Sequence, residues 1–357
     1  MITVSICMIV KNEEDKIARC LDCIKDFGDE IIIVDTGSTD STKEIAAKYT
    51  DKVYDFAWVD DFAAARNYSF SLATMDYIYS ADADEIVDEM NRKKMMQLKE
   101  VLLPEIEIVQ MNYTNQLEFG STYNYDSEPR PKLFKRLRTF EWQDPIHETI
   151  RTFPVIYDSD IDIIHKPHEP HHKRDFAVFK KIIKEAGANG AKGQGGVYDN
   201  DGNDVLRLTA GLTRNARTMY VKELLQKGED SDFLDALGFF KGMADAGILE
   251  LRELNEAVCV IAKCALIRND AAMLMKYVLK NLCDTPCSEI CVIIGEYYYR
   301  QGDYNEAYVW FYNGAYETEP LLVVKYKEEH SIRGLIRCCE RMGDFEQAKK
   351  LEMNIGR

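Results

Sequence analysis

The sequence of 357 residues lacks any apolar run of the roughly 20 residues that a helix needs to cross a bilayer. Residues 1–10 are apolar, but no basic residue precedes them, and the acidic segment 13–15 follows soon after. A signal peptide has a different order, in which a basic segment comes first. We therefore predict a cytoplasmic protein without a transmembrane segment.

The sequence also lacks an excess of positive charge. It has 45 Lys and Arg against 61 Asp and Glu, which gives a formal net charge of −16. Binding to nucleic acid without sequence preference requires a cationic surface, so no nucleic-acid partner is expected.

Cysteine is too scarce for a disulfide scaffold, with ten residues in the whole chain. Cys20 and Cys23 have the spacing of half a zinc site, but no second pair with ligand spacing accompanies them. We predict buried, reduced thiols, which are typical of a reducing compartment.

The chain is longer than one hydrophobic core usually supports, so two domains are expected. Apolar strands at 4–10, 30–34 and 53–56 alternate with helical segments in the first hundred residues. The first helix has four apolar residues on one face: Ile17, Cys20, Leu21 and Ile24. This alternation indicates a doubly wound α/β domain, in which ligands bind beyond the carboxyl ends of the strands.

The largely apolar and aromatic run 75–81 predicts a buried strand that ends just before Asp82 and Asp84. Side chains at i and i+2 of an extended segment point the same way, so the two carboxylates can meet at one point. Such oxygen ligands suit Mg²⁺ or Mn²⁺ that also holds phosphate oxygens. A solvated acidic turn is the alternative for an isolated pair. Asn12 and Asp35 also follow predicted strands, so three strands direct polar groups to one crevice.

The second half of the chain has a different pattern. The glycine-rich stretch 187–202 predicts a flexible loop or linker, and the sequence after about residue 204 is helical in pattern. Gly302-Asp303 recurs as Gly343-Asp344 at the spacings of a tetratricopeptide repeat. The interval is 41 residues, which exceeds the usual period of about 34 and requires a longer connection. A generic helical bundle is the alternative.

Three segments resemble motifs of the family-2 glycosyltransferases of the GT-A fold: Ile9–Glu13, Val34–Thr42 and Asp82–Glu85. Trp58–Asn67 and Ile146–Glu148, followed by a helical-repeat tail, are similar to the branch with the peptide S-glycosyltransferases of glycocin biosynthesis, the sublancin type. The same motifs also occur in lipopolysaccharide-core and flagellin glycosyltransferases, so the resemblance concerns architecture more than acceptor.

The resemblance implies an α/β fold: a Rossmann-like GT-A nucleotide-sugar domain followed by an all-α helical-repeat domain. We expect the first at residues 1–175, a flexible connection at 176–210 and the tetratricopeptide-like domain at 211–357.

The resemblance also implies a donor site for a UDP-sugar. Val10, Asn12, Glu13 and Asp35 would hold uridine and ribose, with Asp35 accepting a hydrogen bond from uracil N3–H. Asp82 and Asp84, with Ala83 between them, would place Mn²⁺ or Mg²⁺ between the two phosphates. Further expected donor-site residues are Asp61, Arg66, Asn67, Arg130, Lys132 and Arg136.

Several of these residues have a second interpretation. Family members often add a metal-binding histidine from a later strand, and His165 after the predicted strand 161–164 is our candidate. An ordinary polar cap is the alternative, and His168, His171 and His172 are weaker candidates because they lie in a loop. Arg66 could instead pair with a neighbouring acid, and the basic residues at 130–136 could lie on a solvated ribbon.

The resemblance also implies transfer by direct displacement with inversion of the anomeric centre, which requires a base that takes the acceptor's proton. The resemblance assigns this role to Glu148, with Trp142 and His147 shaping the acceptor pocket. A thiol acceptor would depend less on the base, because a thiolate forms readily near neutral pH.

These observations predict a metal-dependent inverting glycosyltransferase that moves a sugar from a UDP-sugar to a protein or peptide, at a Ser or Thr hydroxyl or a Cys thiol. The helical tail would bind the acceptor or form a homodimer. Alternatives are a cell-surface glycan or glycolipid acceptor, or a non-catalytic repeat scaffold with a relic GT-A domain. A nucleotidyltransferase is not favoured, because the glycine- and basic-rich nucleotide loop that it would need after the first strand is missing from the sequence. No motif distinguishes glucose, N-acetylglucosamine and galactose as the sugar.

Overall fold

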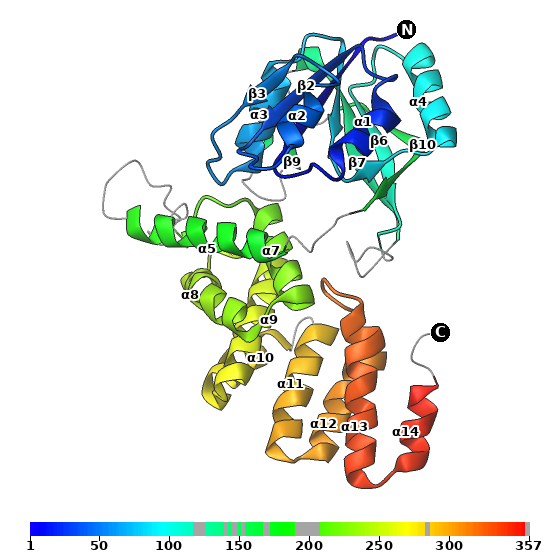
Figure 1. Cartoon of the computed structure of the whole chain (residues 1–357). Coiled ribbons are helices and arrows are strands. Elements are labelled where there is room, and N and C mark those ends of the chain that lie inside the picture. Colours follow the sequence, from blue (N-terminus) through cyan, green and yellow to red (C-terminus); the bar gives the residue numbers. More distant parts are fainter. Residues whose placement is uncertain are drawn as a thin grey trace. The chain divides into compact units, whose positions relative to one another are not determined.

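The computed structural model describes residues 1–116, 126–138, 142–143, 149–150, 154–166, 172–189, 208–282 and 286–353. The chain divides into two compact units, Met1–Pro170 and His171–Arg357 (Figure 1). The first unit is a mixed α/β domain, and the named elements of the second are all helices. No helix in the described ranges combines the length and apolar character that crossing a membrane requires.

Among the described residues, an eight-stranded sheet in the order β3-β2-β1-β4-β7-β6-β10-β5 forms the centre of the first unit. β1 pairs in parallel with both β2 and β4, and β2 pairs in parallel with β3. β7 runs antiparallel to β4 and β6. The bounds are Val4–Val10 (β1), Glu30–Asp35 (β2), Val53–Asp55 (β3), Tyr77–Ala81 (β4), Glu85–Ile86 (β5), Ile108–Thr114 (β6), Glu128–Lys135 (β7) and Ile156–His165 (β10). Trp142–Gln143 (β8) and Thr149–Ile150 (β9) form a separate pair.

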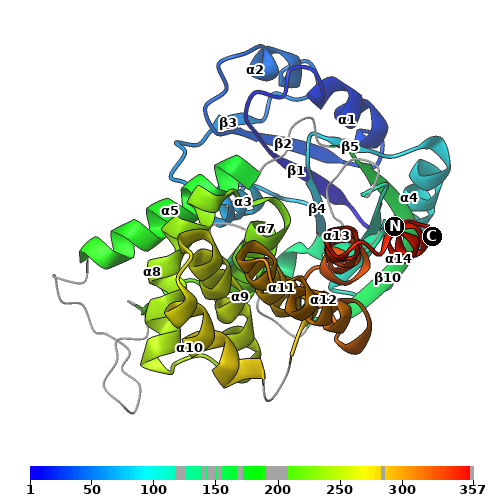
Figure 2. The ribbon, with the colours of Figure 1, turned by 90° about the horizontal axis from the view of Figure 1, so that it is seen from below.

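Helices cover both faces of this sheet: α1 (Ile17–Ile24), α2 (Thr42–Ala46), α3 (Phe62–Ser71) and α4 (Glu89–Val101). Alternate side chains of β1 point to opposite faces of the sheet. Ile6 packs in the core cluster that contains α1 and α4, whereas Cys7 packs in the cluster that contains α3. Figure 2 shows α1 and α2 on the opposite side of β1–β3 from α3. The predicted apolar face of α1 is buried, as expected.

A buried acid, Glu30, connects the amino-terminal ends of the parallel strands β1 and β2. Glu30 at the start of β2 accepts hydrogen bonds from Ser5 of β1 and from the Thr74 amide (2.9 Å), and it pairs with Lys52 at 2.5 Å. Burial opposes ionisation of this carboxyl, but these hydrogen bonds outweigh it and lower the pKa of Glu30 to about 2.

The second unit consists of successive helices. They are α5 (His172–Asn189), α7 (Arg214–Lys227), α8 (Asp230–Ala246), α9 (Leu251–Arg268), α10 (Ala271–Leu282), α11 (Ser288–Gln301), α12 (Tyr304–Tyr312), α13 (Ile332–Met342) and α14 (Phe345–Glu352). The expected connection at 176–210 therefore differs from the structure in its first part, which α5 occupies with the buried residues Phe176 and Phe179. Residues 190–207 lie outside the described ranges.

The recurring Gly-Asp pairs form the turns inside two helix pairs. Gly302 and Gly343 end α11 and α13 with φ of 81° and 84°, which glycine adopts without steric cost. Asp303 and Asp344 then cap α12 and α14, each accepting from a backbone amide at 3.0 Å. The pairs share Phe311 of α12, against which both Gly295 and Gly334 pack.

One buried acid holds the long connection between these pairs. The connection contains two π-helical turns, Asn313–Glu317 and Tyr326–Ser331. The carboxylate of Glu289 in α11 accepts hydrogen bonds from the backbone amides of Leu321, Leu322 and Val323 at 2.8–2.9 Å. Glu289 thus replaces the hydrogen-bond partners that this irregular backbone lacks.

We expect Gly334→Ala to destabilise the helical unit. Its Cβ would overlap the Phe311 ring, and overpacking of this kind costs about 1–3 kcal/mol. Gly238→Ala in α8 is the matched control, because nothing lies within 4 Å of its Cβ and a helical alanine gains roughly 0.5–1 kcal/mol over glycine. Urea unfolding should give changes of opposite sign for the two variants. Equal changes would contradict the packing around Phe311.

A second prediction concerns pH. Because the pKa of Glu30 falls from 4.5 to about 2 on folding, its stabilisation is present above pH 4.5 and is lost as the pH falls towards 2. Glu30→Gln should therefore lower the free energy of unfolding by the order of 3 kcal/mol at pH 7. The difference from wild type should shrink by about 1.4 kcal/mol per pH unit below 4.5.

Glu89→Gln is the control for this measurement, because the Glu89 side chain is 73% exposed and its ion pair is with Lys93 of the same helix. It should leave the free energy of unfolding nearly unchanged at every pH, because an exposed pair within one helix contributes little to stability. A pH-independent effect of Glu30→Gln would refute the role given to its charge.

Candidate active site

The carboxyl ends of three parallel strands meet at one edge of the sheet. Val10 at the end of β1 is in register with Asp35 at the end of β2, and Met8 is in register with Ala81 at the end of β4. The loops that carry Asn12, Asp35 and Asp82 are therefore neighbours, as the sequence predicted. Polar side chains from strands far apart in sequence converge there.

Asp35 has one oxygen in use and one without a partner. Its Oδ1 accepts hydrogen bonds from the amides of Gly37 and Ser38, both at 2.9 Å. Its Oδ2 is buried and has no hydrogen-bond partner in the described residues. A buried acceptor without a donor is costly, so this oxygen marks a place where a ligand N–H or O–H group would be stabilised.

The residues after β1 hold the loop after β2. The Val10 carbonyl accepts from the Thr36 amide at 2.9 Å, and Asn12 Oδ1 accepts from the Thr39 amide at 2.8 Å. Asn12 has a φ of 54°, which asparagine tolerates better than most residues. The Glu13 carboxylate pairs with Lys16 at 2.8 Å. Val10, Asn12 and Glu13 are thus engaged in shaping the two loops.

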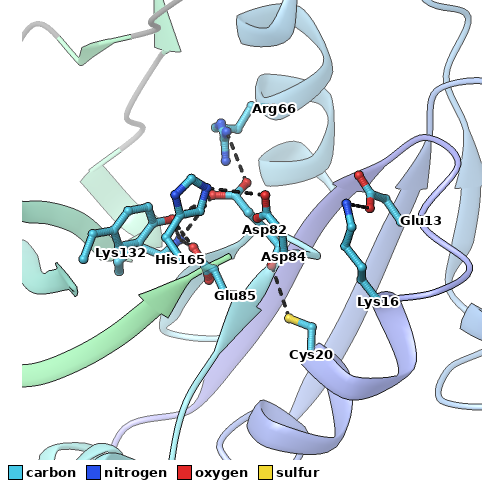
Figure 3. Close-up of polar contacts among 10 residues, drawn as sticks. Glu13, Lys16, Cys20, Arg66, Asp82, Asp84, Glu85, Lys132 and His165 are labelled. Atoms are coloured by element: carbon cyan, nitrogen blue, oxygen red, sulfur yellow. Dashed lines mark hydrogen bonds and ion pairs between the residues drawn. The ribbon is translucent and has the colours of Figure 1, made fainter. Parts of the chain in front are cut away.

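Asp82, Asp84 and His165 lie together at the end of β4. Asp84 Oδ2 is 3.4 Å from His165 Nε2, and Figure 3 shows the three side chains directed toward one another. Burial opposes protonation of His165, but its contact with Asp84 raises the pKa of the imidazole. His165 is the last residue of β10 and pairs in register with Glu85 of β5. A later strand therefore brings this histidine to the aspartate pair.

Two cationic side chains approach Asp82. Its Oδ1 is 3.6 Å from Arg66 Nη2, and its Oδ2 is 3.5 Å from Lys132 Nζ. Burial opposes ionisation of Asp82, but these positive charges hold the pKa of its carboxyl well below its usual range. Arg66 also donates to Ser80 Oγ at 2.6 Å and lies over the Trp142 ring, 4.8 Å from its centre. Arg66 is held at the site by three contacts.

A buried polar cluster lies behind the aspartates. Lys132 of β7 pairs with Glu85 at 2.5 Å, and their side chains are only 3% and 1% exposed. Tyr113 of β6 donates to Asp82 Oδ2 at 3.0 Å, and its hydroxyl also contacts Glu85. Burial raises the pKa of Glu85 to about 7, although Lys132 counteracts this. Sequence reasoning gave no role to Tyr113 or Glu85, and it placed Lys132 toward the ligand or solvent.

Asp61 and Asn67 have local structural partners. Asp61 caps α3 by accepting from the Ala64 amide at 2.9 Å. Asn67 forms two hydrogen bonds with the backbone of Trp142, at 2.8 and 3.0 Å, which attach β8 to α3. Trp142 itself is buried against Phe70 and Phe134.

The structure separates the two arginines expected at the diphosphate. Arg130 lies near the site, 6.0 Å from the Tyr113 ring, and pairs with Glu128 at 2.6 Å. Arg136 instead donates to the Met75 carbonyl at 2.5 Å, before the start of β4. The five residues of β4 lie between this contact of Arg136 and Asp82, which places the two about 17 Å apart. The expectation for Arg136 is therefore wrong, because antiparallel β7 leads away from the site.

The residues at the edge fit a divalent cation. Neighbouring ligands of an octahedral Mg²⁺ lie about 3 Å apart, and the Asp84–His165 contact is close to this value. No group of three such side chains in the described residues forms a complete metal site. Mg²⁺ commonly uses one or two carboxylates together with substrate phosphates and water, so a preformed cage is not required. Glu148, His147, His168 and His171 lie outside the described residues, as does the His172 side chain.

A mixed sheet with polar groups at the ends of its parallel strands defines the first unit as a GT-A-like α/β domain. Residues 5–162 match the family model described as glycosyl transferase family 2. The chain therefore contains a family 2 glycosyl transferase domain, which confirms the resemblance found in the sequence.

Three curated relatives show similarity over parts of their length. A TPR repeat-containing protein of Synechococcus elongatus is 48% identical over 85 residues, which are 24% of this chain and 21% of that protein. The SPbeta prophage-derived glycosyltransferase SunS of Bacillus subtilis is 36% identical over 102 residues, covering 28% and 24%. An uncharacterized glycosyltransferase of Rickettsia typhi is 28% identical over 176 residues, covering 46% and 56%. The chain thus spans between about a fifth and about half of these relatives.

Solved structures also show similarity. Glucosyl-3-phosphoglycerate synthase from Mycobacterium tuberculosis, in complex with Mn²⁺, UDP and glucosyl-3-phosphoglycerate, is 15% identical with a TM-score of 0.38. The alignment covers 56% of this chain and 83% of that one.

Proposed function

We propose that this chain is a metal-dependent inverting glycosyltransferase that transfers a sugar from a UDP-sugar to a protein or peptide. The observation that carries the proposal is the convergence of Asp82, Asp84 and His165 beside the partly unpaired Asp35, at one edge of a family 2 domain. A diphosphate-linked donor requires a cation at one end and recognition of its base at the other. Both requirements have candidate residues here.

Asp84 and His165, with Asp82, would hold the cation. When bound, Mn²⁺ or Mg²⁺ supplies electrostatic stabilisation of the departing diphosphate. The Asp35 Oδ2 atom would accept from the uracil N3–H, for which a buried acceptor without a partner is suited. Arg66 and Arg130 would add positive charge near the phosphates, since Arg66 already lies 3.6 Å from Asp82.

Support for a peptide or protein acceptor is of a different kind. The sequence resembles peptide S-glycosyltransferases, and part of it aligns with the glycosyltransferase SunS. Paired helices with shared packing, as in α11–α14, provide an extended surface of the kind that binds peptide segments. In this proposal Glu148 takes the acceptor proton, and Trp142 and His147 lie at the acceptor pocket.

The donor half of the proposal can be tested without an acceptor. Purified protein is incubated with Mn²⁺ and UDP-glucose, UDP-N-acetylglucosamine or UDP-galactose, and UDP release is measured. Asp84→Asn should reduce hydrolysis by roughly 100-fold or more, because a bound metal stabilises the transition state by several kcal/mol. Asp22→Asn on α1, with a side chain 56% exposed, is the matched control and should retain full activity. If no UDP-sugar is hydrolysed or raises the melting temperature, the proposed donor is wrong.

The acceptor half requires a separate measurement. Glu148→Gln should leave the UDP-sugar affinity unchanged and reduce transfer to a Ser- or Thr-containing peptide by roughly 100–10,000-fold, the usual range for a general base. Transfer to a Cys peptide should fall less, because the thiolate needs less assistance. Mass spectrometry of the peptides measures both. Loss of donor binding in this variant would contradict the role of Glu148, and modification of glycans alone would contradict a peptide acceptor.

A further inference from the structure

Two buried side chains from neighbouring antiparallel strands contact the same atom of Asp82. The Tyr113 hydroxyl, from β6, lies 3.0 Å from Asp82 Oδ2, and Lys132 Nζ, from β7, lies 3.5 Å from it. These two groups also contact each other at 3.2 Å. Glu85 completes the cluster by pairing with Lys132 at 2.5 Å. We call Tyr113, Lys132 and Glu85 the anchoring cluster.

The Tyr113 side chain contacts two of the proposed metal-binding residues. Its ring stacks on the His165 imidazole, with centres 5.1 Å apart and an angle of 15° between the planes. Its single hydroxyl lies within hydrogen-bond distance of both Asp82 Oδ2 and the Glu85 carboxylate. One side chain therefore fixes the position of a carboxylate and the plane of an imidazole that come from different strands.

The contacts of Asp82 are not symmetric. Oδ2 contacts Tyr113 and Lys132 of the anchoring cluster, whereas Oδ1 lies 3.6 Å from the Arg66 guanidinium. The terminal torsion of an aspartate is broad, and the two oxygens of its carboxylate are chemically equivalent. Tyr113 and Lys132 on one oxygen and Arg66 on the other fix the plane of the carboxylate, and the oxygen we call Oδ2 is the one occupied by two buried partners.

We propose that Tyr113 and Lys132 are positioning residues for the metal site: they anchor Oδ2 of Asp82, so that Oδ1 is the oxygen presented to the divalent cation. This inference rests on the proposed function and adds to it the ligating atom and the residues that select it. Partners behind a metal ligand typically change metal affinity by 10–100-fold when they are removed.

The competing explanation is that the cluster serves only folding, as a satisfied ion pair in the core. Removing one partner of such a pair would then lower stability without a specific effect on the cation. A readout that follows cation affinity separates the two explanations. The suitable quantity is the Mn²⁺ concentration at which UDP raises the melting temperature by half of its maximal shift.

Tyr113→Phe is the first variant, because it removes the hydroxyl and keeps the ring on His165. Its half-maximal Mn²⁺ concentration should rise about 10-fold or more relative to wild type. Tyr77→Phe is the matched control: Tyr77 is also buried, and its hydroxyl donates to the Ile106 carbonyl at 2.6 Å, at the opposite end of the strands. It should lower the melting temperature without changing the Mn²⁺ requirement.

A second variant covers Lys132, whose single replacement would leave Glu85 buried without its cation. The double change Lys132→Met and Glu85→Gln removes one charge of each sign, and it should also raise the Mn²⁺ requirement about 10-fold. A crystal structure with Mn²⁺ and UDP should show Oδ1 of Asp82 on the metal and Oδ2 still on Tyr113.

The outcomes distinguish this inference from the function on which it rests. If UDP never raises the melting temperature of the wild type at any Mn²⁺ concentration, the proposed function fails, and the inference fails with it. If the wild type responds and Tyr113→Phe responds at the same Mn²⁺ concentration, the positioning role is overturned while the function stands. Bidentate binding of Asp82 in the crystal would also overturn it.

Discussion

The parallel pairing of β1 with both β2 and β4 is the constraint on which the site depends. Parallel neighbours end at the same edge of a sheet, so the residues that follow each strand become neighbours without any direct sequence relation. The register Val10–Asp35 and Met8–Ala81 places the base-recognition and metal-binding candidates side by side. Glu30, at the opposite end of the same strands, joins β1, β2 and the segment before β4.

The balance of charge at the edge explains how so many acids can coexist there. Asp82, Asp84 and Glu85 lie within four residues of the chain, and Arg66, Lys132 and His165 each contact one or more of them. Each of these three partners comes from a different element. The two permanent cations, Arg66 and Lys132, offset part of the negative charge of the acids, and a divalent cation that arrived with a diphosphate would bring its own negative partner.

Much of the first domain could be predicted from the sequence, because its strands are continuous apolar runs and its motifs follow them directly. Asp35, Asp82, Asp84 and His165 lie where the pattern placed them. The pairing of Lys132 with Glu85 could not be predicted, because the residues are 47 positions apart and lie on strands that are not consecutive in the chain. Strand direction caused the error at Arg136. This residue lies only four positions after Lys132, but β7 runs antiparallel to β4 and carries it to the other end of the sheet.

The helical unit shows how one buried side chain can hold the connection between two repeats. The Gly-Asp turns made the two helix pairs recognisable, but the extra length between them had no pattern of its own. Glu289 gives that length a fixed shape, because its two oxygens hold three consecutive amides of the connection. A change at Glu289 would consequently alter the connection between the two helix pairs while leaving the Gly-Asp turn inside each pair in place.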